Sequence, residues 1–382
     1  MITRIKSRRI IQKNGLLEGY VYFENDRILA VTEQELPYDC EVDAGEQYVS
    51  PGFIDLHTHG GGGHDFSNSV EDVIEGCNFH LMHGTTSITP TLASAFFADM
   101  EKGVSYIDAA MRDARCRSNI IGAHLEGPYL ALSQSGAQSP ECITEPIESD
   151  YTALIERYGR AVARWSYAPE RDRGGAFCRY LTQHGVNVSA GHTDATYPDM
   201  LCAIQNGCNS VTHLFSCTST ITRERGHRIL GVTETALLSD EIYAEIIADG
   251  KHLPPELIRL IVKAKGSDRV MLVTDSLSVA GQESGFGRLV NIDFVIEDGV
   301  CRLMDRSAFA GSIATTDRLV RVVTKEAGFS MWEAVKMASY VPAEVMKLNK
   351  GELAAGRDAD ILIFDDDVRI SHVWVMGNRC LP

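Results

Sequence analysis

The chain has 382 residues, and its 36 Lys and Arg against 52 Asp and Glu give a formal net charge of −16. The 44% hydrophobic and 23% charged residues exclude a disordered chain. Proteins that bind nucleic acid need a basic surface to neutralise phosphates, so this charge argues against that class. The length allows two or three domains, or one (β/α)8 barrel beside a smaller domain.

The cysteines and the N-terminus indicate where the protein resides. Ten cysteines are spread from Cys40 to Cys380, and no two have CxxC spacing. This pattern is typical of reduced, mostly buried thiols in a cytoplasmic protein. The basic first residues are followed by no apolar segment, so they do not form a signal peptide. No run of about 18 apolar residues is present, so we expect no membrane contact.

The two ends of the chain share a pattern that the middle lacks. Short β-like segments occupy residues 19–23 and 27–31 near the start, and 359–364 and 370–376 near the end. Turn-forming residues lie between or after them.

The middle of the chain alternates short apolar runs with longer amphipathic stretches, which is typical of βα units. Helices are predicted over 70–82, 151–158, 197–206 and 255–265. Eight strands with intervening helices favour a closed parallel barrel. The alternative, an open doubly wound sheet, needs a glycine-rich first turn that opens directly into a helix. Glycines 60–63 fit that turn poorly, because they run into His64-Asp65. The eight runs are 48–59, 85–92, 119–130, 162–170, 186–192, 209–215, 241–249 and 269–276.

Polar residues that can bind a cation end five of these eight runs. The ends of barrel strands converge on one face, where active sites are built. Imidazole and carboxylate groups are the ligands that zinc and iron(II) favour. Taken singly, each residue has an ordinary structural explanation, but their joint occurrence predicts a metal site. The residues are His57 and His59 in the first run, then Glu126, His192, His213 and Asp275 in the third, fifth, sixth and eighth.

The remaining histidines and motifs carry less information. His252 lies just past the seventh run, on the same face of the barrel, and is expected to reach a substrate. We expect the other histidines to be structural or surface residues. The chain has no Gly-x-Ser-x-Gly, HExxH or Walker A sequence, so serine-hydrolase, zincin and P-loop chemistry are poorly supported. Gly311-Ser312 is a common pair that fits either a phosphate-binding element or a turn.

Several segments resemble known families. Residues 51–59 (PGFIDLHTH) resemble the first strand of the amidohydrolase superfamily, and residues 351–360 (GELAAGRDAD) resemble its C-terminal β segment. Within that superfamily, the chain resembles the N-acetylglucosamine-6-phosphate deacetylase family over nearly its whole length. The segments that carry this narrower resemblance, in the family order, are 124–128 (HLEGP), 189–193 (SAGHT), 212–215 (THLF), 247–250 (IADG) with His252, and 272–275 (LVTD).

The resemblance implies an α/β fold with a metal-dependent (β/α)8 TIM-type barrel over residues 51–346. A small β-sandwich domain would be built from both chain ends, residues 1–50 and 347–382, and the protein would be a homodimer. Glu126, His192 and His213 would hold the principal metal, while His57 and His59 make a second metal plausible. We expect one or two divalent ions per subunit, Zn²⁺ first, with Fe²⁺ or Mn²⁺ as alternatives. Residues 162–170 contain no Lys that could bridge two metals, so Glu126 would be the bridging carboxylate.

The implied activity is removal of the N-acetyl group from N-acetylglucosamine-6-phosphate, giving glucosamine-6-phosphate and acetate. Asp275 would be the general base and then the acid, and His252 would stabilise the oxyanion. The substrate-binding segments depart from the family pattern. Gly136-Ala137-Gln138 stands where the family commonly has Gly-Ala-His, and Ser216-Cys217-Thr218 where it has Asn-Ala-Met. Deacetylation is therefore better supported than the identity of the sugar phosphate.

Two further expectations concern the residue that binds the phosphate and the alternative functions. Arg223 is favoured over Arg225 and Arg228 for the phosphate. The alternatives are a deacetylase of another sugar phosphate, such as N-acetylgalactosamine-6-phosphate, a cyclic-amide hydrolase of the same superfamily, and a catalytically silent binding barrel.

Overall fold

Eight parallel strands form the centre of the structure, a computed structural model that describes residues 1–381. Each of the eight lies within one of the predicted apolar runs, so the barrel prediction is confirmed and the open doubly wound sheet is wrong. In order around the barrel the strands are β5 (Phe53–Thr58), β8 (Thr85–Leu92), β10 (Ala123–Glu126), β11 (Val162–Tyr167), β12 (Asn187–Ala190), β13 (Ser210–Val211), β16 (Tyr243–Ile246) and β17 (Val270–Leu272).

The barrel closes between its first and last strands at their C-terminal ends. The Asp275 backbone N–H donates to the His57 carbonyl over 2.8 Å, and the His59 N–H donates to the Ser276 carbonyl, also over 2.8 Å. Below these bonds the Thr274 hydroxyl donates to a carboxylate oxygen of Asp55 over 2.6 Å. The closing contacts therefore flank the residues that the sequence singles out as metal ligands.

Helices surround the barrel and bury one face each. In α1, Ser69 caps the helix by accepting from the Asp72 N–H, and Val73, Ile74, Cys77 and Leu81 point into the core. This spacing of three and four residues is that of an amphipathic helix. The helices are α1 (Val70–Met82), α2 (Phe97–Ala110), α3 (Glu148–Tyr158), α4 (Ala176–Gln183), α5 (Tyr197–Gln205), α6 (Val232–Leu238), α7 (Pro255–Lys265), α8 (Thr316–Lys325), α9 (Met331–Val335) and α10 (Val341–Val345).

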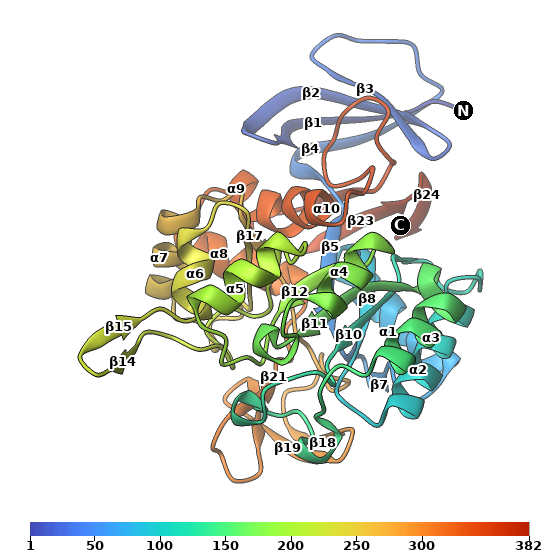
Figure 1. The fold of residues 1–382 in the computed structure, drawn as a ribbon. Coiled ribbons are helices and arrows are strands. Elements are labelled where there is room, and N and C mark those ends of the chain that lie inside the picture. Colours follow the sequence, from blue (N-terminus) through green and yellow to red (C-terminus); the bar gives the residue numbers. More distant parts are fainter. Residues whose placement is uncertain (382) are drawn as a thin grey trace.

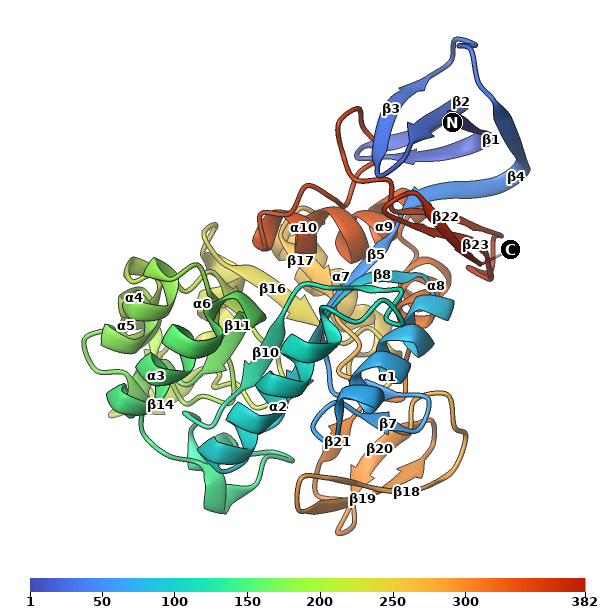
Figure 2. The same ribbon diagram turned by 90° about the vertical axis from the view of Figure 1, so that its right-hand side faces the viewer.

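Strands from both chain ends form a separate sheet of seven strands. The central β4 pairs in parallel with β1 and antiparallel with β22, which joins the two ends of the chain. Figures 1 and 2 place this sheet at one end of the barrel, with both termini beside it. In order the strands are β24 (Asn378–Leu381), β23 (Ile370–Val375), β22 (Ile361–Phe364), β4 (Cys40–Pro51), β1 (Thr3–Gln12), β2 (Gly15–Glu24) and β3 (Arg27–Thr32).

A four-stranded antiparallel sheet covers the opposite end of the barrel (Figures 1 and 2). Its apolar side chains, including Phe294 and Cys301, pack on Ala93, Leu277 and Val279 from the loops after β8 and β17. No pattern in the sequence predicts this sheet. Its strands are β18 (Gly285–Leu289), β19 (Ile292–Glu297), β20 (Val300–Leu303) and β21 (Phe309–Gly311).

Short strands complete the described chain. The hairpin of β14 (Thr222–Glu224) and β15 (His227–Ile229) projects from the side of the barrel (Figure 1). The pair of β6 (Gly60–Gly61) and β7 (His64–Asp65) follows β5, and β9 (Asn119–Ile120) pairs with β8. Within residues 1–381, no helix has the length and apolarity needed to cross a lipid bilayer.

Candidate metal and substrate site

The predicted ligands gather at the C-terminal ends of five barrel strands. Glu126 ends β10, while His192, His213 and Asp275 follow β12, β13 and β17. These last three adopt left-handed backbone conformations, with φ of 47°, 29° and 45°. Such conformations are uncommon for residues other than glycine and concentrate at functional sites. The turn after each strand therefore aims a polar side chain back over the mouth of the barrel.

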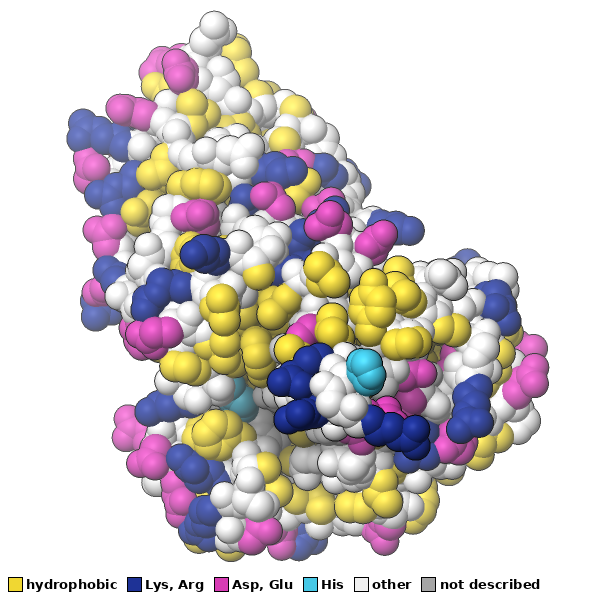
Figure 3. Space-filling view, turned by 60° about the vertical axis from the view of Figure 1, so that its left-hand side comes forward, with side chains coloured by type: hydrophobic (Ala, Val, Ile, Leu, Met, Phe, Trp, Pro, Cys, Tyr) yellow, Lys and Arg dark blue, Asp and Glu magenta, His cyan; other side chains and the backbone are white. Residues whose placement is uncertain are grey.

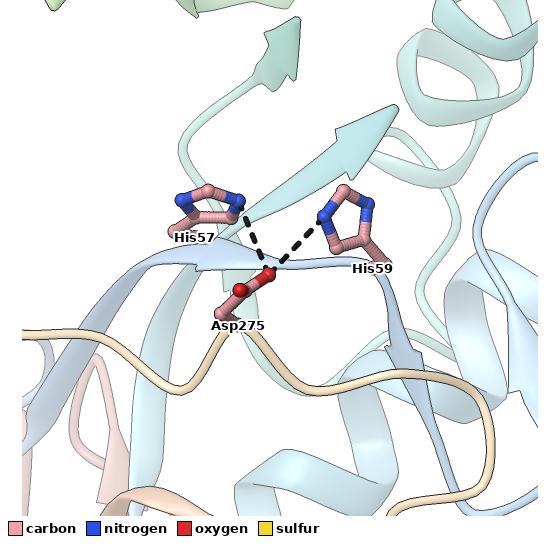
Figure 4. Close-up of side chains that lie close together, drawn as sticks. All are labelled: His57, His59 and Asp275. Carbon is pink, nitrogen blue, oxygen red and sulfur yellow. Dashed lines mark ion pairs between the residues drawn. The ribbon is translucent and has the colours of Figure 1, made fainter. Parts of the chain in front are cut away.

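The ligands form two adjacent clusters. Glu126, His192 and His213 make one, and His57, His59 and Asp275 make the other, with ligand atoms in each cluster within 4.8 Å of one another. In Figure 4 both rings of the second cluster face the Asp275 carboxylate. The His57 and His59 Nε2 atoms lie 3.4 Å and 3.3 Å from its Oδ1 atom.

The Glu126 carboxylate lies between the two clusters. Its Oε1 atom is 2.9 Å from His213 Nε2, 3.1 Å from His192 Nε2 and 3.4 Å from His57 Nε2. Its Oε2 atom is 3.2 Å from His59 Nε2. One carboxylate thus faces four imidazoles, which is the position of a ligand shared by two cations.

The donor set fits divalent cations. The Nδ1 atoms of His192 and His213 are occupied by the carbonyls of Gln134, at 2.8 Å, and Ser216, at 3.1 Å. Carbonyl partners fix the ring orientation and leave Nε2 to ligate, as is usual for metal-bound histidine. His57 Nε2 is fully buried and has no hydrogen-bond partner. Imidazole nitrogens and carboxylate oxygens in this number suit zinc, iron(II) or manganese(II).

The charges of the clusters shift the pKa values of their members. Burial alone disfavours every charged form, but the carboxylates of Glu126 and Asp275 outweigh it and raise the pKa of His57 well above its ordinary value. Burial also lowers the pKa of His59, yet Asp275 and Glu126 raise it to about 9. Conversely, burial raises the pKa of the Glu126 carboxyl, but His57 and His192 outweigh it and lower the pKa well below the usual range. In the metal-free protein, protons on the imidazoles balance the negative charges of Glu126 and Asp275.

Cation binding should therefore release protons. Below pH 9 His59 is protonated in the metal-free protein and cannot ligate, so metal affinity should rise with pH up to about 9. We expect at least about one proton released per chain at pH 7. Calorimetric titration of zinc into chelator-treated protein, in buffers with different ionisation enthalpies, measures this number. Zinc binding that is independent of buffer and of pH between 6 and 9 would contradict this charge balance.

A cavity of about 190 Å³ opens above the clusters. A concave site lined by a few convergent polar groups is typical of small-molecule binding. Leu289 and residues 308–311 of the four-stranded sheet form its roof. His57 lies beneath the cavity, fully buried. Ten predicted site residues line it: His59, Glu126, Ala137, Gln138, His192, His213, Ser216, Cys217, His252 and Asp275.

Gln138 connects the cavity wall to Glu126. Its side-chain NH₂ donates to Glu126 Oε2 over 2.5 Å, and its carbonyl oxygen accepts from the Ser94 N–H over 2.7 Å. The side chain is only 4% exposed. Gln138 therefore fixes the orientation of the shared carboxylate in addition to lining the cavity.

His252 is held at the other wall. Its Nδ1 atom lies 2.9 Å from a carboxylate oxygen of Asp249, and its ring meets Phe309 edge-on at 4.9 Å between ring centres. Burial raises the pKa of Asp249, but the hydrogen bond from His252 outweighs it and lowers the pKa. Asp249 thus orients the ring and leaves Nε2 to face a ligand.

The structure does not bring Arg223 into the cavity of its own chain. Arg223, Arg225 and Arg228 lie on the β14–β15 hairpin and are exposed, as is His227. On the face of the molecule that carries this hairpin, Lys or Arg and His side chains gather beside a band of hydrophobic side chains (Figure 3). Exposed leucines on this side of the barrel are Leu201 in α5, Leu238 in α6 and Leu260 in α7.

The roles of the roof residues and of the charges inside the barrel are not apparent from the sequence. Gly311 belongs to a common Gly-Ser pair, yet its φ is 141° and an added Cβ would lie 3.0 Å from the Asp275 carbonyl. Arg164 and Glu245 lie in predicted strands but are fully buried. His124, by contrast, is a buried structural residue, one of the two expected outcomes, and bonds the hydroxyls of Thr91 and Ser166.

Comparisons with known proteins agree with this site. The Amidohydrolase family model matches residues 48–380. An N-acetylglucosamine-6-phosphate deacetylase of Lysinibacillus sphaericus is 32% identical over 89% of this chain and 87% of its own. An N-acetylgalactosamine-6-phosphate deacetylase of Escherichia coli O157:H7 is 27% identical over 98% of both.

A solved structure extends the likeness to the whole fold. A variant of N-acetyl-D-glucosamine-6-phosphate deacetylase from Mycobacterium smegmatis, in complex with N-acetyl-D-glucosamine-6-phosphate, superposes with a TM-score of 0.92 at 29% identity and covers both chains completely. Such agreement over the full barrel, the end sheet and the roof leaves no part of the fold outside the match. The chain therefore belongs to the amidohydrolase family.

Proposed function

We propose that this protein hydrolyses the N-acetyl group of N-acetylglucosamine-6-phosphate to glucosamine-6-phosphate and acetate. The observation that carries the proposal is the pair of clusters joined by Glu126 at the floor of a cavity roofed by residues 308–311. The relatives that match over nearly the whole chain are deacetylases of amino-sugar phosphates. We therefore prefer this activity to two alternatives, a cyclic-amide hydrolase and a barrel that only binds a ligand.

The site would hold one or two divalent cations. Glu126, His192 and His213 would bind the first, and His57, His59 and Asp275, with Glu126 shared, the second. A divalent cation held by these residues would act as a Lewis acid and would lower the pKa of a coordinated water to about 7. We propose zinc as the native metal, with iron(II) or manganese(II) as alternatives.

Asp275 would move the protons of the reaction. Burial raises the pKa of this carboxyl, but His57 and His59 outweigh it and lower the pKa, so Asp275 is ionised at neutral pH. An ionised carboxylate accepts a proton from the attacking water and then delivers it to the departing amine. His252, fixed by Asp249, would donate to the oxygen of the acetamide carbonyl as negative charge develops there.

Acetate release tests the proposal directly. Chelator-treated protein should release acetate from N-acetylglucosamine-6-phosphate once zinc, iron(II) or manganese(II) is added, and should not release it without metal. N-acetylgalactosamine-6-phosphate and unphosphorylated N-acetylglucosamine are the comparison substrates. A higher kcat/KM for the galactosamine compound would assign the chain to that substrate. Ser216, Cys217 and Gln138, which depart from the family pattern, would then account for the altered specificity. No acetate from any of these compounds with any metal would reject a deacetylase.

We further propose that Arg223 binds the phosphate from the second subunit of a homodimer. The exposed arginines of the hairpin and the exposed leucines on α5 and α6 lie on one side of the barrel, which favours contact with a second copy there. One bidentate arginine suits a phosphate group.

The Arg223→Ala variant should raise KM for the phosphorylated sugar by about 10–100-fold and leave the unphosphorylated sugar unaffected, as loss of a charged hydrogen bond predicts. Arg225→Ala and Arg228→Ala are the matched controls. At a substrate concentration far below the raised KM, mixing Arg223→Ala chains with Asp275→Asn chains should restore activity in mixed dimers, because one site then has both residues. Equal effects on both sugars would reject the phosphate role, and an absence of restored activity would reject the crossed arrangement.

The remaining proposals concern domains and location. We propose that residues 1–50 and 347–382 form one small domain and residues 51–346 the barrel, because β4 joins both chain ends. The ten cysteines are all free thiols, which supports a reducing, cytoplasmic location.

A further inference from the structure

A pair of opposite charges is buried inside the barrel, below the ligand clusters. Arg164 of β11 and Glu245 of β16 are each 0% exposed, and Arg164 Nη2 lies 2.5 Å from Glu245 Oε2. Taking two charges out of water is costly, and a hydrophobic pair of similar volume usually stabilises a fold as well or better. Fold stability alone therefore does not explain this pair.

The pair contacts the ligand-bearing strands directly. Glu245 Oε1 lies 2.8 Å from His57 Nδ1 and accepts the His213 backbone N–H over 3.2 Å. Arg164 Nη1 donates to the carbonyl of Leu56, the residue before His57, over 3.1 Å. His57 is thus held through both its ring and its backbone.

The three cluster imidazoles whose Nδ1 atoms have partners are not held alike. His192 and His213 rest on backbone carbonyls, which a side-chain substitution leaves in place. His57 rests on the Glu245 side chain alone, and its Nε2 atom is buried without a partner. A change at Glu245 should therefore act on the His57 ring far more than on the rings of His192 and His213.

We infer that Glu245, fixed in place by Arg164, is a positioning residue for the second metal: it keeps the proton of His57 on Nδ1 and turns Nε2 toward Glu126 and Asp275. A carboxylate behind a metal-binding histidine fixes its tautomer and raises its basicity, and loss of such a partner commonly costs 10–100-fold in metal affinity. The inference rests on the proposed metal site, and it assigns the buried pair to one of the two cations.

Two double variants test the inference without leaving a buried charge unpaired. Arg164→Met with Glu245→Leu removes the pair and the acceptor for His57 Nδ1–H. Arg164→Met with Glu245→Gln removes the charges but keeps an acceptor oxygen. Metal content per chain and zinc affinity are measured by elemental analysis and competitive titration, with the cobalt(II) visible spectrum as an independent readout of coordination.

The wild type should bind two ions, the Leu variant should bind the second 10–100-fold more weakly, and the Gln variant should recover most of that loss. The affinity for the first ion should change far less, because Glu245 contacts only the backbone N–H of His213 and the Ser216 carbonyl still holds its ring. Equal affinities in all three proteins, equal losses in both variants, or a wild type that binds one ion would each overturn the inference. If neither variant folds, ¹⁵N shifts of His57 in the zinc-loaded wild type decide: a proton on Nδ1 supports the inference, and a proton on Nε2 overturns it. Two bound ions without acetate release would reject only the proposed function.

Discussion

Replacing Asp275 by Asn is expected to lower kcat by about 10²–10⁴-fold, the contribution of one positioned acid–base group. An amide of the same shape still fills the space beside His57 and His59 but can neither accept the proton of the attacking water nor deliver it to the amine. The cation at Glu126, His192 and His213 should remain, because none of these ligands is altered. Steady-state kinetics and elemental analysis on the same sample measure both effects.

A matched control shows that the effect is local. Asp293→Asn removes a carboxylate from the roof sheet, where it pairs with Arg288 at the surface. This variant should retain wild-type kcat. Near-normal turnover by the Asp275 variant would exclude Asp275 from proton transfer.

Replacing Glu126 by Gln should have a different signature, because it removes the carboxylate shared by both clusters. A neutral amide offers one oxygen, and it cannot bridge two cations. Its loss also leaves protonated His57 without its main counter-charge and removes from His192 a counter-charge that ranks after Cys217, so the pKa of both imidazoles should fall. We expect loss of bound metal and loss of acetate release by at least about 10³-fold, the order that oxyanion and metal stabilisation supply.

Elemental analysis after dialysis, followed by assays with added zinc, measures this outcome. Glu297→Gln, which alters an exposed carboxylate paired with Arg306, is the control. If the Glu126→Gln protein still held two ions, the two clusters would bind cations independently of a shared carboxylate. Asp275→Asn should thus lose proton transfer but keep the first cation, whereas Glu126→Gln should lose bound metal and the reaction together.

The strands and the convergence of the candidate ligands were predictable because their signals are local. Each barrel strand is an apolar run of the right length, and each candidate ligand ends such a run, so His57, Glu126 and Asp275 could be assigned to one face without knowing any contact. The same holds for α1 and α7, whose bounds were predicted from spacing and from Pro254-Pro255.

The roof sheet and the buried pair depend on contacts between distant segments. The strands of residues 285–311 are short and half exposed, and they form only because Phe294 and Cys301 find Ala93 and Leu277 beneath them. Arg164 and Glu245 read as ordinary strand residues until the barrel places them within 2.5 Å. The family resemblance alone suggested a phosphate role for Arg223, and the distance of Arg223 from the cavity depends on a hairpin whose course no local pattern reveals.

The closure of the barrel between β5 and β17 bears on how the protein unfolds. Among the described residues, β5 and β17 are joined by backbone bonds at the His57–Asp275 and His59–Ser276 levels, where the second cluster also lies. An ion bound by His57, His59 and Asp275 would cross-link the first and last strands of the barrel, and it would stabilise the folded state more as the ion concentration rises. Removal of the ion by a chelator would weaken the contact between these two strands, so the metal-free protein should begin to unfold where the barrel closes.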